Sequence, residues 1–358
     1  MDVYKIAQEN RDYIYGLRRY FHENPELSWE EVNTTKRIAE ELEKLNIPYR
    51  LLPKTGLVAT LEGNKKRPII GLRADIDALP VNEKRECEFK SKIEGKMHAC
   101  GHDAHIAMLL GAAKILSENR DKLECTVRFI FQPAEEVIQG ARTLLIDEEV
   151  MECDNLMAIH IFPVGTISVE EGPRFTSADT IKIKVIGKGG HGSMPHQAVD
   201  PIMAAAHVIT SLQTIASREI NPNETCVVSI CTVHAGTLSN IIPNDVQLTG
   251  TVRTFNPKVR EQLPEIIERI IKNTCSSFRA SYEYEFIHGT PATINEKKSS
   301  ERAERAVKKI LGEKGLIKYE KTPGGEDFAW LLEKIPGYLA FVGCRNEEEE
   351  YIYPLHHE

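Results

Sequence analysis

Two short stretches decide the fold: residues 125–131 read CTVRFIF and residues 156–162 read LMAIHIF. Both are strand-like runs, and a helical stretch around 141–145 separates them. A mostly apolar helix is expected over 104–116, ahead of the first run. Strands that alternate with helices favour parallel sheets with both faces covered. The pattern therefore predicts an α/β fold, a three-layer domain with a mostly parallel sheet.

The N-terminal part of the chain predicts a capped helix and a hairpin. Residues 28–31 (SWEE) have the form of a capping box, which would open a helix running to about Leu45. Residues 58–61 and 69–72 are strand-like and flank the turn residues Gly63-Asn64. We therefore expect these two strands to pair as a hairpin with a long loop.

From Asp179 onward the pattern changes to strands interrupted by two helices. Strands are expected at 180–186, 225–233, 246–255 and 281–287, and helices at 201–217 and 257–278. This order, β-α-β-β-α-β, is that of the ferredoxin-like unit, which can form a two-layer domain by itself. We therefore predict an α/β domain made of 1–174 and 291–358, interrupted by an inserted ferredoxin-like α+β domain at 175–290.

Composition narrows the class of protein further. The 358 residues are 41% hydrophobic, enough for the cores of two domains. The net charge of −8 leaves no basic excess for nucleic acid. The charged N-terminus does not predict a signal peptide. The longest apolar run, residues 106–113, is too short to predict a membrane span. Eight scattered cysteines without a CxxC pair predict reduced thiols and a cytoplasmic protein.

Metal-capable side chains occur just before the predicted apolar helix and at the carboxyl ends of the two strand-like runs. They are Cys100, His102, Glu135, Glu136 and His160. In an open α/β sheet the carboxyl ends of the strands share one edge, so we expect these groups to converge there. Thiolate, imidazole and carboxylate together suit zinc, cobalt or manganese. Taken singly, each has a plainer interpretation: a core histidine, a small buried thiol, or solvent-facing glutamates.

Two further segments have alternative interpretations. Asp75, in Arg73-Ala74-Asp75, is either a partner that orients a ligand histidine or half of a structural Arg–Asp pair. Residues 187–192 (GKGGHG) match the GxGxxG pattern of nucleotide-binding folds, but no helix is expected after them. We interpret this segment as an exposed loop that presents His191 and His196.

Six motifs carry a resemblance to a known family. They are FHENPELS at 21–28, GLRADIDALP at 71–80, MHACGHD at 97–103, FQPAEE at 131–136, GGHGSMPH at 189–196 and GGEDF at 324–328. Together they resemble the aminoacylase–carboxypeptidase family of dinuclear metallohydrolases. The most similar branch comprises amidohydrolases of N-acyl amino acids, hippurate and auxin conjugates.

The resemblance implies two divalent metal ions in the catalytic domain, zinc, manganese or cobalt. Cys100 would bridge them, and the remaining ligands would be His102, Glu136, His160 and His356. Glu135 would be the general base, and Asp75 would support the metal site.

The resemblance also implies that residues 1–174 and 291–358 form the catalytic domain, and that the inserted domain at 175–290 serves as lid and dimerisation domain. His191 would stabilise the oxyanion from the partner subunit of a homodimer, and Asn240 and Arg253 would hold the substrate carboxylate. Arg253 also suits a surface ion pair, and Asn240 an ordinary turn.

Two departures from the family stand out. Distant members carry a His-x-Asp ligand pair where this chain has Arg73-Ala74-Asp75, and His102 would supply the missing imidazole. The chain ends directly after Leu355-His356-His357, and we expect it to lack part of the catalytic domain. The Pro-Leu-His pattern favours His356 over His357 as the ligand.

The predicted function is hydrolysis of the amide of a small N-acyl-L-amino acid to a carboxylic acid and an amino acid. A carboxypeptidase or dipeptidase of the same family is the first alternative. A non-catalytic metal-binding protein would be expected to have lost the base or a ligand. A structural zinc protein would need a closed four-ligand site without a free glutamate beside it.

Overall fold

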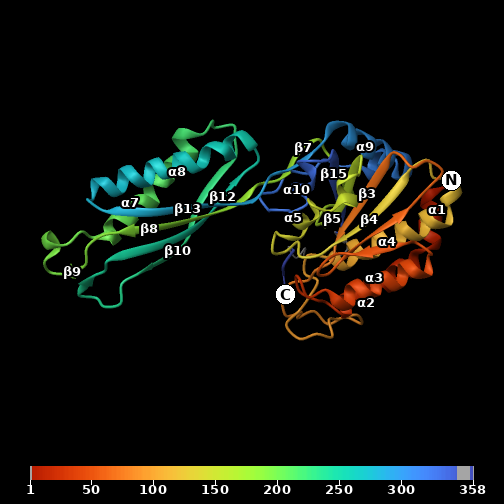
Figure 1. The fold of residues 1–358 in the computed structure, drawn as a ribbon, viewed down its shortest axis with the longest axis horizontal. Coiled ribbons are helices and arrows are strands. Elements are labelled where there is room, and N and C mark those ends of the chain that lie inside the picture. Colours follow the sequence, from red (N-terminus) through yellow and green to blue (C-terminus); the bar gives the residue numbers. More distant parts are fainter. Residues whose placement is uncertain (1, 345–354, 358) are drawn as a thin grey trace. The chain divides into compact units, whose positions relative to one another are not determined.

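The computed structural model describes residues 2–344 and 355–357. The chain divides into two compact units. The first unit comprises Met1–Arg174, Ile294–Glu320 and Asp327–Glu358, and the second comprises Phe175–Thr293 and Lys321–Glu326. Each is described here by itself (Figure 1).

A seven-stranded sheet forms the centre of the first unit, in the order β1-β2-β4-β3-β5-β15-β6. The bounds are β1 Tyr49–Leu51, β2 Leu57–Leu61, β4 Thr126–Gln132, β3 Ile69–Asp75, β5 Asn155–Phe162, β15 Gly337–Gly343 and β6 Ile167–Ser168. The four central strands, β4, β3, β5 and β15, run parallel to their neighbours within this group, and the outer strands are antiparallel. The predicted α/β class with a mostly parallel central sheet is confirmed.

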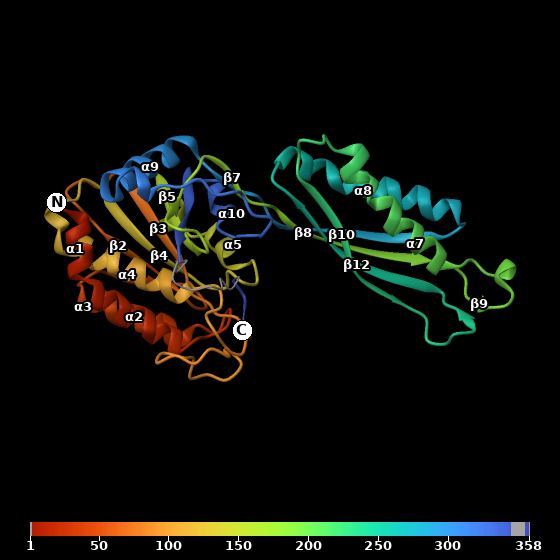
Figure 2. The same cartoon turned by 180° about the vertical axis from the view of Figure 1, so that it is seen from behind.

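Helices cover both faces of this sheet. Their bounds are α1 Val3–Glu9, α2 Arg11–Glu23, α3 Val32–Lys44, α4 His102–Glu118, α5 Gly140–Leu144, α6 Glu148–Met151, α9 Lys297–Leu311 and α10 Ala329–Leu332. Helices α2, α3 and α4 gather on one side, where Phe129 and Phe131 of β4 join their core (Figures 1 and 2). Alternate residues such as Val58 and Ile130 are also fully buried, which requires cover on the opposite face.

Two local predictions for the N-terminal part are wrong. The strands β2 and β3 do not form a hairpin, because β4 lies between them and pairs with both. All seven residues of β4 are buried, so this strand needs a partner on each edge. Ser28 does not cap a helix either: α3 begins at Val32, and the Ser28 hydroxyl donates to Asp77 Oδ2 at 2.7 Å.

The second unit holds a four-stranded antiparallel sheet in the order β10-β12-β8-β13. Along the chain the elements are β8 Ala178–Ile186, α7 Pro201–Leu212, β10 Cys226–Ala235, β12 Asp245–Thr254, α8 Pro257–Ser277 and β13 Ser281–Thr290. This is the β-α-β-β-α-β order expected of a ferredoxin-like unit. Its core lies between the sheet and the two helices.

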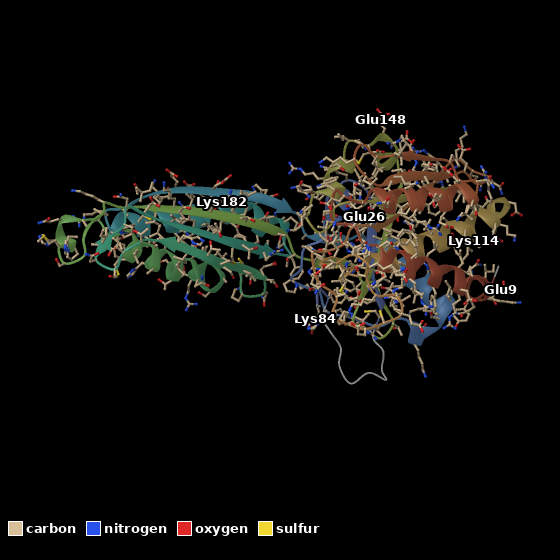
Figure 3. The ribbon with its side chains drawn as sticks, turned by 90° about the horizontal axis from the view of Figure 1, so that it is seen from below. Glu9, Glu26, Lys84, Lys114, Glu148 and Lys182 are labelled. Carbon is tan, nitrogen blue, oxygen red and sulfur yellow. The ribbon has the colours of Figure 1, made fainter. Side chains whose placement is uncertain are left out.

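Two further pairs of short strands are described: β7 Gly172–Phe175 pairs with β14 Thr293–Asn295, and β9 Gly190–His191 with β11 Ile241–Ile242. Charged side chains such as Glu9, Glu148 and Lys182 point outward from the surfaces of their units (Figure 3). Among the described residues, no helix is both long and apolar enough to cross a membrane.

Candidate metal centre

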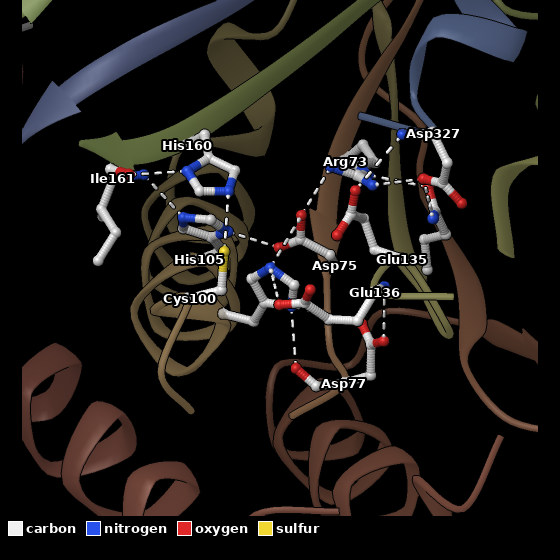
Figure 4. Close-up of polar contacts among 12 residues, drawn as sticks. Arg73, Asp75, Asp77, Cys100, His105, Glu135, Glu136, His160, Ile161 and Asp327 are labelled. Atoms are coloured by element: carbon white, nitrogen blue, oxygen red, sulfur yellow. Dashed lines mark hydrogen bonds and ion pairs between the residues drawn. The ribbon is translucent and has the colours of Figure 1, made fainter. Parts of the chain in front are cut away.

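The predicted metal-capable residues meet at the carboxyl edge of the sheet. Asp75 ends β3, Glu135 and Glu136 follow β4, and His160 lies near the end of β5. Helix α4 begins at His102, which brings Cys100 to the same place (Figure 4). Parallel strands deliver their carboxyl ends to one edge, so residues far apart in sequence become neighbours.

Cys100 is shared by two groups of candidate ligands. One group joins it to His102 and His160, and the other to Glu136 and His356; within each, the ligand atoms lie within 4.8 Å of one another. The Cys100 sulfur lies 3.5 Å from His160 Nε2 and 3.3 Å from His356 Nε2. A sulfur common to two ligand groups is the arrangement that a bridging thiolate between two cations requires.

The imidazoles of two of these histidines are oriented by backbone carbonyls. His102 Nδ1 donates to the carbonyl of Asp77 at 2.9 Å, and His160 Nδ1 donates to the carbonyl of Ile161 at 2.7 Å. Each ring therefore directs Nε2 toward the site. Within the described part of the chain, His102 Nε2 is buried without a hydrogen-bond partner. A buried ring nitrogen without a partner fits a metal ligand.

Glu136 lies between His102 and His356. Its Oε1 is 3.8 Å from His102 Nε2, and its Oε2 is 3.6 Å from His356 Nε2. Burial raises the pKa of Glu136 to about 7. A carboxylate held in a buried site beside other acidic groups is costly unless a cation compensates it.

Burial also favours the neutral forms of the Cys100 thiol and the His160 imidazole. It raises the pKa of the Cys100 thiol well above its usual range and lowers the pKa of His160 to about 3. Neutral His160 is the form that binds a metal, whereas Cys100 must lose its proton. The donor set of one thiol, three imidazoles and a carboxylate fits zinc, cobalt or manganese.

His356 is anchored from the backbone. Its N–H donates to the carbonyl of Ala99 at 2.9 Å, so the residue is held next to Cys100. Its side chain remains 52% exposed. Of the adjacent pair His356-His357, His356 is the one that joins the Cys100 group.

Asp75 contacts both partners that the sequence offered as alternatives, an arginine and a predicted ligand histidine. Its Oδ2 accepts from Arg73 Nη1 at 2.8 Å and lies 3.7 Å from His102 Nε2. Its Oδ1 accepts from Nδ1 of His105, whose Nε2 accepts from the Ile161 N–H at 2.8 Å. Burial would raise the pKa of Asp75, but in the metal-free protein the positive charges of protonated His102 and of Arg73 hold that pKa well below its usual range. His102 must lose this proton before its Nε2 can bind a metal.

Sequence reasoning missed His105 and Asp77. His105 follows His102 by one helical turn on α4, a spacing that places both on one face of the helix. Asp77 supplies the carbonyl that orients His102, and its Oδ1 lies 3.3 Å from the same ring nitrogen. The alternation in Asp75-Ile76-Asp77 was a signal for two buried carboxylates, but nothing local indicates which histidine each one meets.

Glu135 is buried beside the ligand groups. One of its carboxylate oxygens lies within 4.8 Å of the ligand atoms of His102 and Glu136. Its Oε1 accepts the backbone N–H of Asp327 at 3.4 Å. Consecutive glutamates on a turn thus bring two carboxylates to the same group of candidate ligands.

The other predicted site residues belong to the second unit. His191 is exposed in the loop at β9, and its Nδ1 lies 2.8 Å from the Ser193 hydroxyl. Asn240 lies in an exposed turn, and its carbonyl accepts the Gly192 N–H at 2.8 Å. Arg253 is half-buried on β12, its Nε donates to Thr251 Oγ1 at 3.1 Å, and it forms no ion pair with any described residue.

Comparisons with known proteins agree with this geometry. The model of peptidase family M20/M25/M40 matches residues 71–358. Thermostable carboxypeptidase 2 of Saccharolobus solfataricus is 40% identical over 98% of this chain and 90% of its own length. N-acetylcysteine deacetylase of Bacillus subtilis is 42% identical, covering 94% of this chain and 89% of the deacetylase.

A plant relative and a crystal structure extend the comparison. IAA-amino acid hydrolase ILR1-like 4 of Arabidopsis thaliana is 39% identical over 94% of this chain and 78% of the hydrolase. The crystal structure of Bacillus subtilis YXEP, described as a dinuclear metal-binding peptidase, superposes with a TM-score of 0.86 at 38% identity, covering 98% of this chain and 92% of that one. From its sequence motifs, its fold and these matches, the chain belongs to peptidase family M20/M25/M40.

Proposed function

We propose that this protein is a metal-dependent amidohydrolase that cleaves N-acyl-L-amino acids into a carboxylic acid and an amino acid. The observation that carries the proposal is the pair of ligand groups sharing Cys100, with Glu135 buried beside them. The names of two similar proteins, a deacetylase of N-acetylcysteine and a hydrolase of IAA-amino acids, support amide bonds of acylated amino acids as the substrate class.

Two divalent ions would be held by Cys100, His102, Glu136, His160 and His356, and Cys100 belongs to both groups of candidate ligands. The ions, zinc, manganese or cobalt, would polarise the amide carbonyl and acidify a water molecule. The relative described as a dinuclear metal-binding peptidase supports a stoichiometry of two. Asp75 is proposed to support the metal site, because it accepts a hydrogen bond from His105 and lies next to the proposed ligand His102.

Glu135 is the proposed general base. Its carboxylate takes a proton from the attacking water and returns it to the nitrogen of the leaving amine. Two features support the assignment: Glu135 is adjacent to a ligand, and the N–H of Asp327 fixes one of its oxygens. The retained base also argues against a non-catalytic metal-binding protein.

The second unit is proposed to act as an inserted lid and dimerisation domain. In this scheme His191 stabilises the oxyanion from the partner subunit, and Asn240 and Arg253 hold the substrate carboxylate. Exposed apolar side chains on α7, Ile202 at 46% and Met203 at 49%, support a homodimer, since such groups are costly in water. We also place the protein in the cytoplasm, because all eight cysteines are free.

A carboxypeptidase or dipeptidase is the second candidate. Two relatives at 40% identity are named thermostable carboxypeptidases, so peptide substrates need a direct comparison. Both candidates use the same centre and differ in what occupies the acyl side of the scissile bond.

The test is a hydrolysis screen on protein stripped of metal and reloaded separately with zinc, manganese or cobalt. Substrates are N-acetyl and N-benzoyl amino acids and matched dipeptides with the same C-terminal residue. The proposal expects higher kcat/KM on the acyl amino acids. Preference for dipeptides would favour the second candidate, and no hydrolysis with any metal would refute both.

A further inference from the structure

The turn that carries Glu135 and Glu136 has an unusual backbone. Ala134 and Ile138, neither of them glycine, adopt φ angles of 54° and 60°. The left-handed region is unfavourable for a β-branched residue such as isoleucine. Gly140 closes the turn, where an added Cβ would lie 1.7 Å from the carbonyl oxygen of Pro133. Such a conformation persists only where surrounding groups hold it, and it often marks a functional segment.

Three buried carboxylates accept hydrogen bonds from backbone N–H groups of this turn and of α5, the helix that follows it directly. Glu31 Oε1 accepts from Ala134 N at 2.9 Å, Asp77 Oδ2 from Glu136 N at 3.0 Å, and Asp327 Oδ2 from Ala141 N at 2.8 Å. All three side chains belong to residues that are at most 1% exposed. They come from three distant segments: the residue before α3, the loop after β3, and the loop before α10.

Each carboxylate is itself anchored by a second group. The Thr55 hydroxyl donates to Glu31 Oε2 at 2.6 Å, and the Ser28 hydroxyl donates to Asp77 Oδ2 at 2.7 Å. Asp327 Oδ1 accepts from Gln132 Nε2 at 2.7 Å and from Arg73 Nη2 at 3.1 Å. The three carboxylates are therefore held in position by other side chains as well. Hydrogen bonds to a charged carboxylate are stronger than those between neutral groups.

We propose that Glu31, Asp77 and Asp327 form a carboxylate clamp: three positioning residues that set the turn so that Glu135 and Glu136 point into the metal centre. Figure 4 shows Glu136 beside Asp77 and Glu135 beside Asp327, which also donates its N–H to Glu135 Oε1. The inference rests on the proposed function, because it assigns the clamp to a base and a ligand. A misplacement of about 1 Å at a reacting group can cost about 100-fold in rate.

The decisive comparison is between Glu31→Ala and Glu41→Ala. Glu41 is a matched control on α3: it is a buried carboxylate in the same unit, and its partners Tyr13 and Arg37 lie outside the turn. Both variants lose a buried carboxylate, but only Glu31→Ala releases the Ala134 N–H. With zinc-loaded protein we expect kcat to fall about 100-fold in Glu31→Ala relative to Glu41→Ala, with KM changed less than about twofold and two metals retained.

Rescue separates positioning from general destabilisation. Glu31→Gln keeps an oxygen that can accept the Ala134 N–H, so its kcat should return to within about threefold of the wild type. Equal kcat in Glu31→Ala and Glu41→Ala would overturn the clamp, and so would a Glu31→Gln variant as slow as Glu31→Ala. If Glu31→Ala does not fold, Thr55→Val removes only the hydroxyl that anchors Glu31, and the same comparison is made with an expected loss of about 10-fold.

Hydrogen exchange tests the clamp without relying on activity. In metal-free protein the amides of Ala134 and Glu136 should exchange at least about 10-fold faster in Glu31→Ala or Thr55→Val than in Glu41→Ala. Unchanged exchange would overturn the clamp whatever the enzyme does. A different outcome would separate the two proposals. If the variants exchange faster but the wild-type protein hydrolyses none of the substrates, the proposed function is refuted and the clamp remains as a property of the turn.

Discussion

Replacement of Glu135 by glutamine isolates proton transfer from metal binding. Glu135→Gln preserves the volume of a residue that is 6% exposed, and the glutamine carbonyl can still accept the Asp327 N–H that Glu135 Oε1 receives at 3.4 Å. The change that matters is the loss of a proton acceptor. General-base catalysis contributes about 10²–10⁴-fold, so the barrier should rise by about 3–5 kcal/mol while KM changes little.

The matched control is Glu136→Gln, one residue along the same turn. Glu136 has both oxygens within 3.6–3.8 Å of histidine nitrogens, so its amide variant should lose metal as well as activity. We expect two metals per chain in Glu135→Gln and about one in Glu136→Gln, measured by elemental analysis after dialysis. Single-turnover hydrolysis of an N-acyl amino acid gives the rate. Unaltered hydrolysis in Glu135→Gln would refute its role as base, and an equal loss of metal in both variants would make Glu135 a ligand instead.

Four further perturbations have defined outcomes. Cobalt-loaded protein should show thiolate-to-metal charge-transfer absorption, and Cys100→Ser should abolish it; a retained band would place the sulfur elsewhere. Burial lowers the pKa of His98 to about 4 from 6.5, so the unfolded state of the metal-free protein binds the extra proton, and stability is lost as pH falls from about 6.5 toward 4. Between pH 7 and 5 the free energy of unfolding, measured by denaturant titration, should fall by about 2 kcal/mol because of His98. The His98→Phe variant should lack this part of the pH dependence. Gly140→Ala should lower the free energy of unfolding by about 1–3 kcal/mol, because its Cβ meets the Pro133 carbonyl; a neutral result would mean that the turn relaxes readily. Ile202→Lys with Met203→Lys should turn the proposed dimer into a monomer in analytical ultracentrifugation, whereas an unchanged mass would move the interface away from α7.

Local sequence patterns were enough for most of the elements. The apolar run 125–131 appears as β4, one residue shifted at each end, and the run 156–162 as most of β5. The β-α-β-β-α-β order of the second unit is also present. These predictions succeed because strand and helix periodicity depend on neighbours in sequence.

The pairing of strands could not be predicted in the same way. Residues 58–61 and 69–72 look like a hairpin because they are close in sequence, yet β4 lies between the strands β2 and β3 that contain them. A central position in the sheet buries every side chain of β4, and this gain outweighs the low entropic cost of joining two neighbouring strands by a short loop. Nothing within the two strands themselves signals this competition.

By itself, the sequence determined the chemistry of this protein: a thiol, imidazoles and carboxylates at strand ends, in motifs of one hydrolase family. Only the tertiary structure decided how they work together. It placed Cys100 in two ligand groups, turned His102 by the Asp77 carbonyl, and brought Glu31, Asp77 and Asp327 onto the turn of Glu135. The physical reason is that ligand identity is a property of single residues, whereas lone-pair direction depends on hydrogen bonds from segments that meet only in the folded chain.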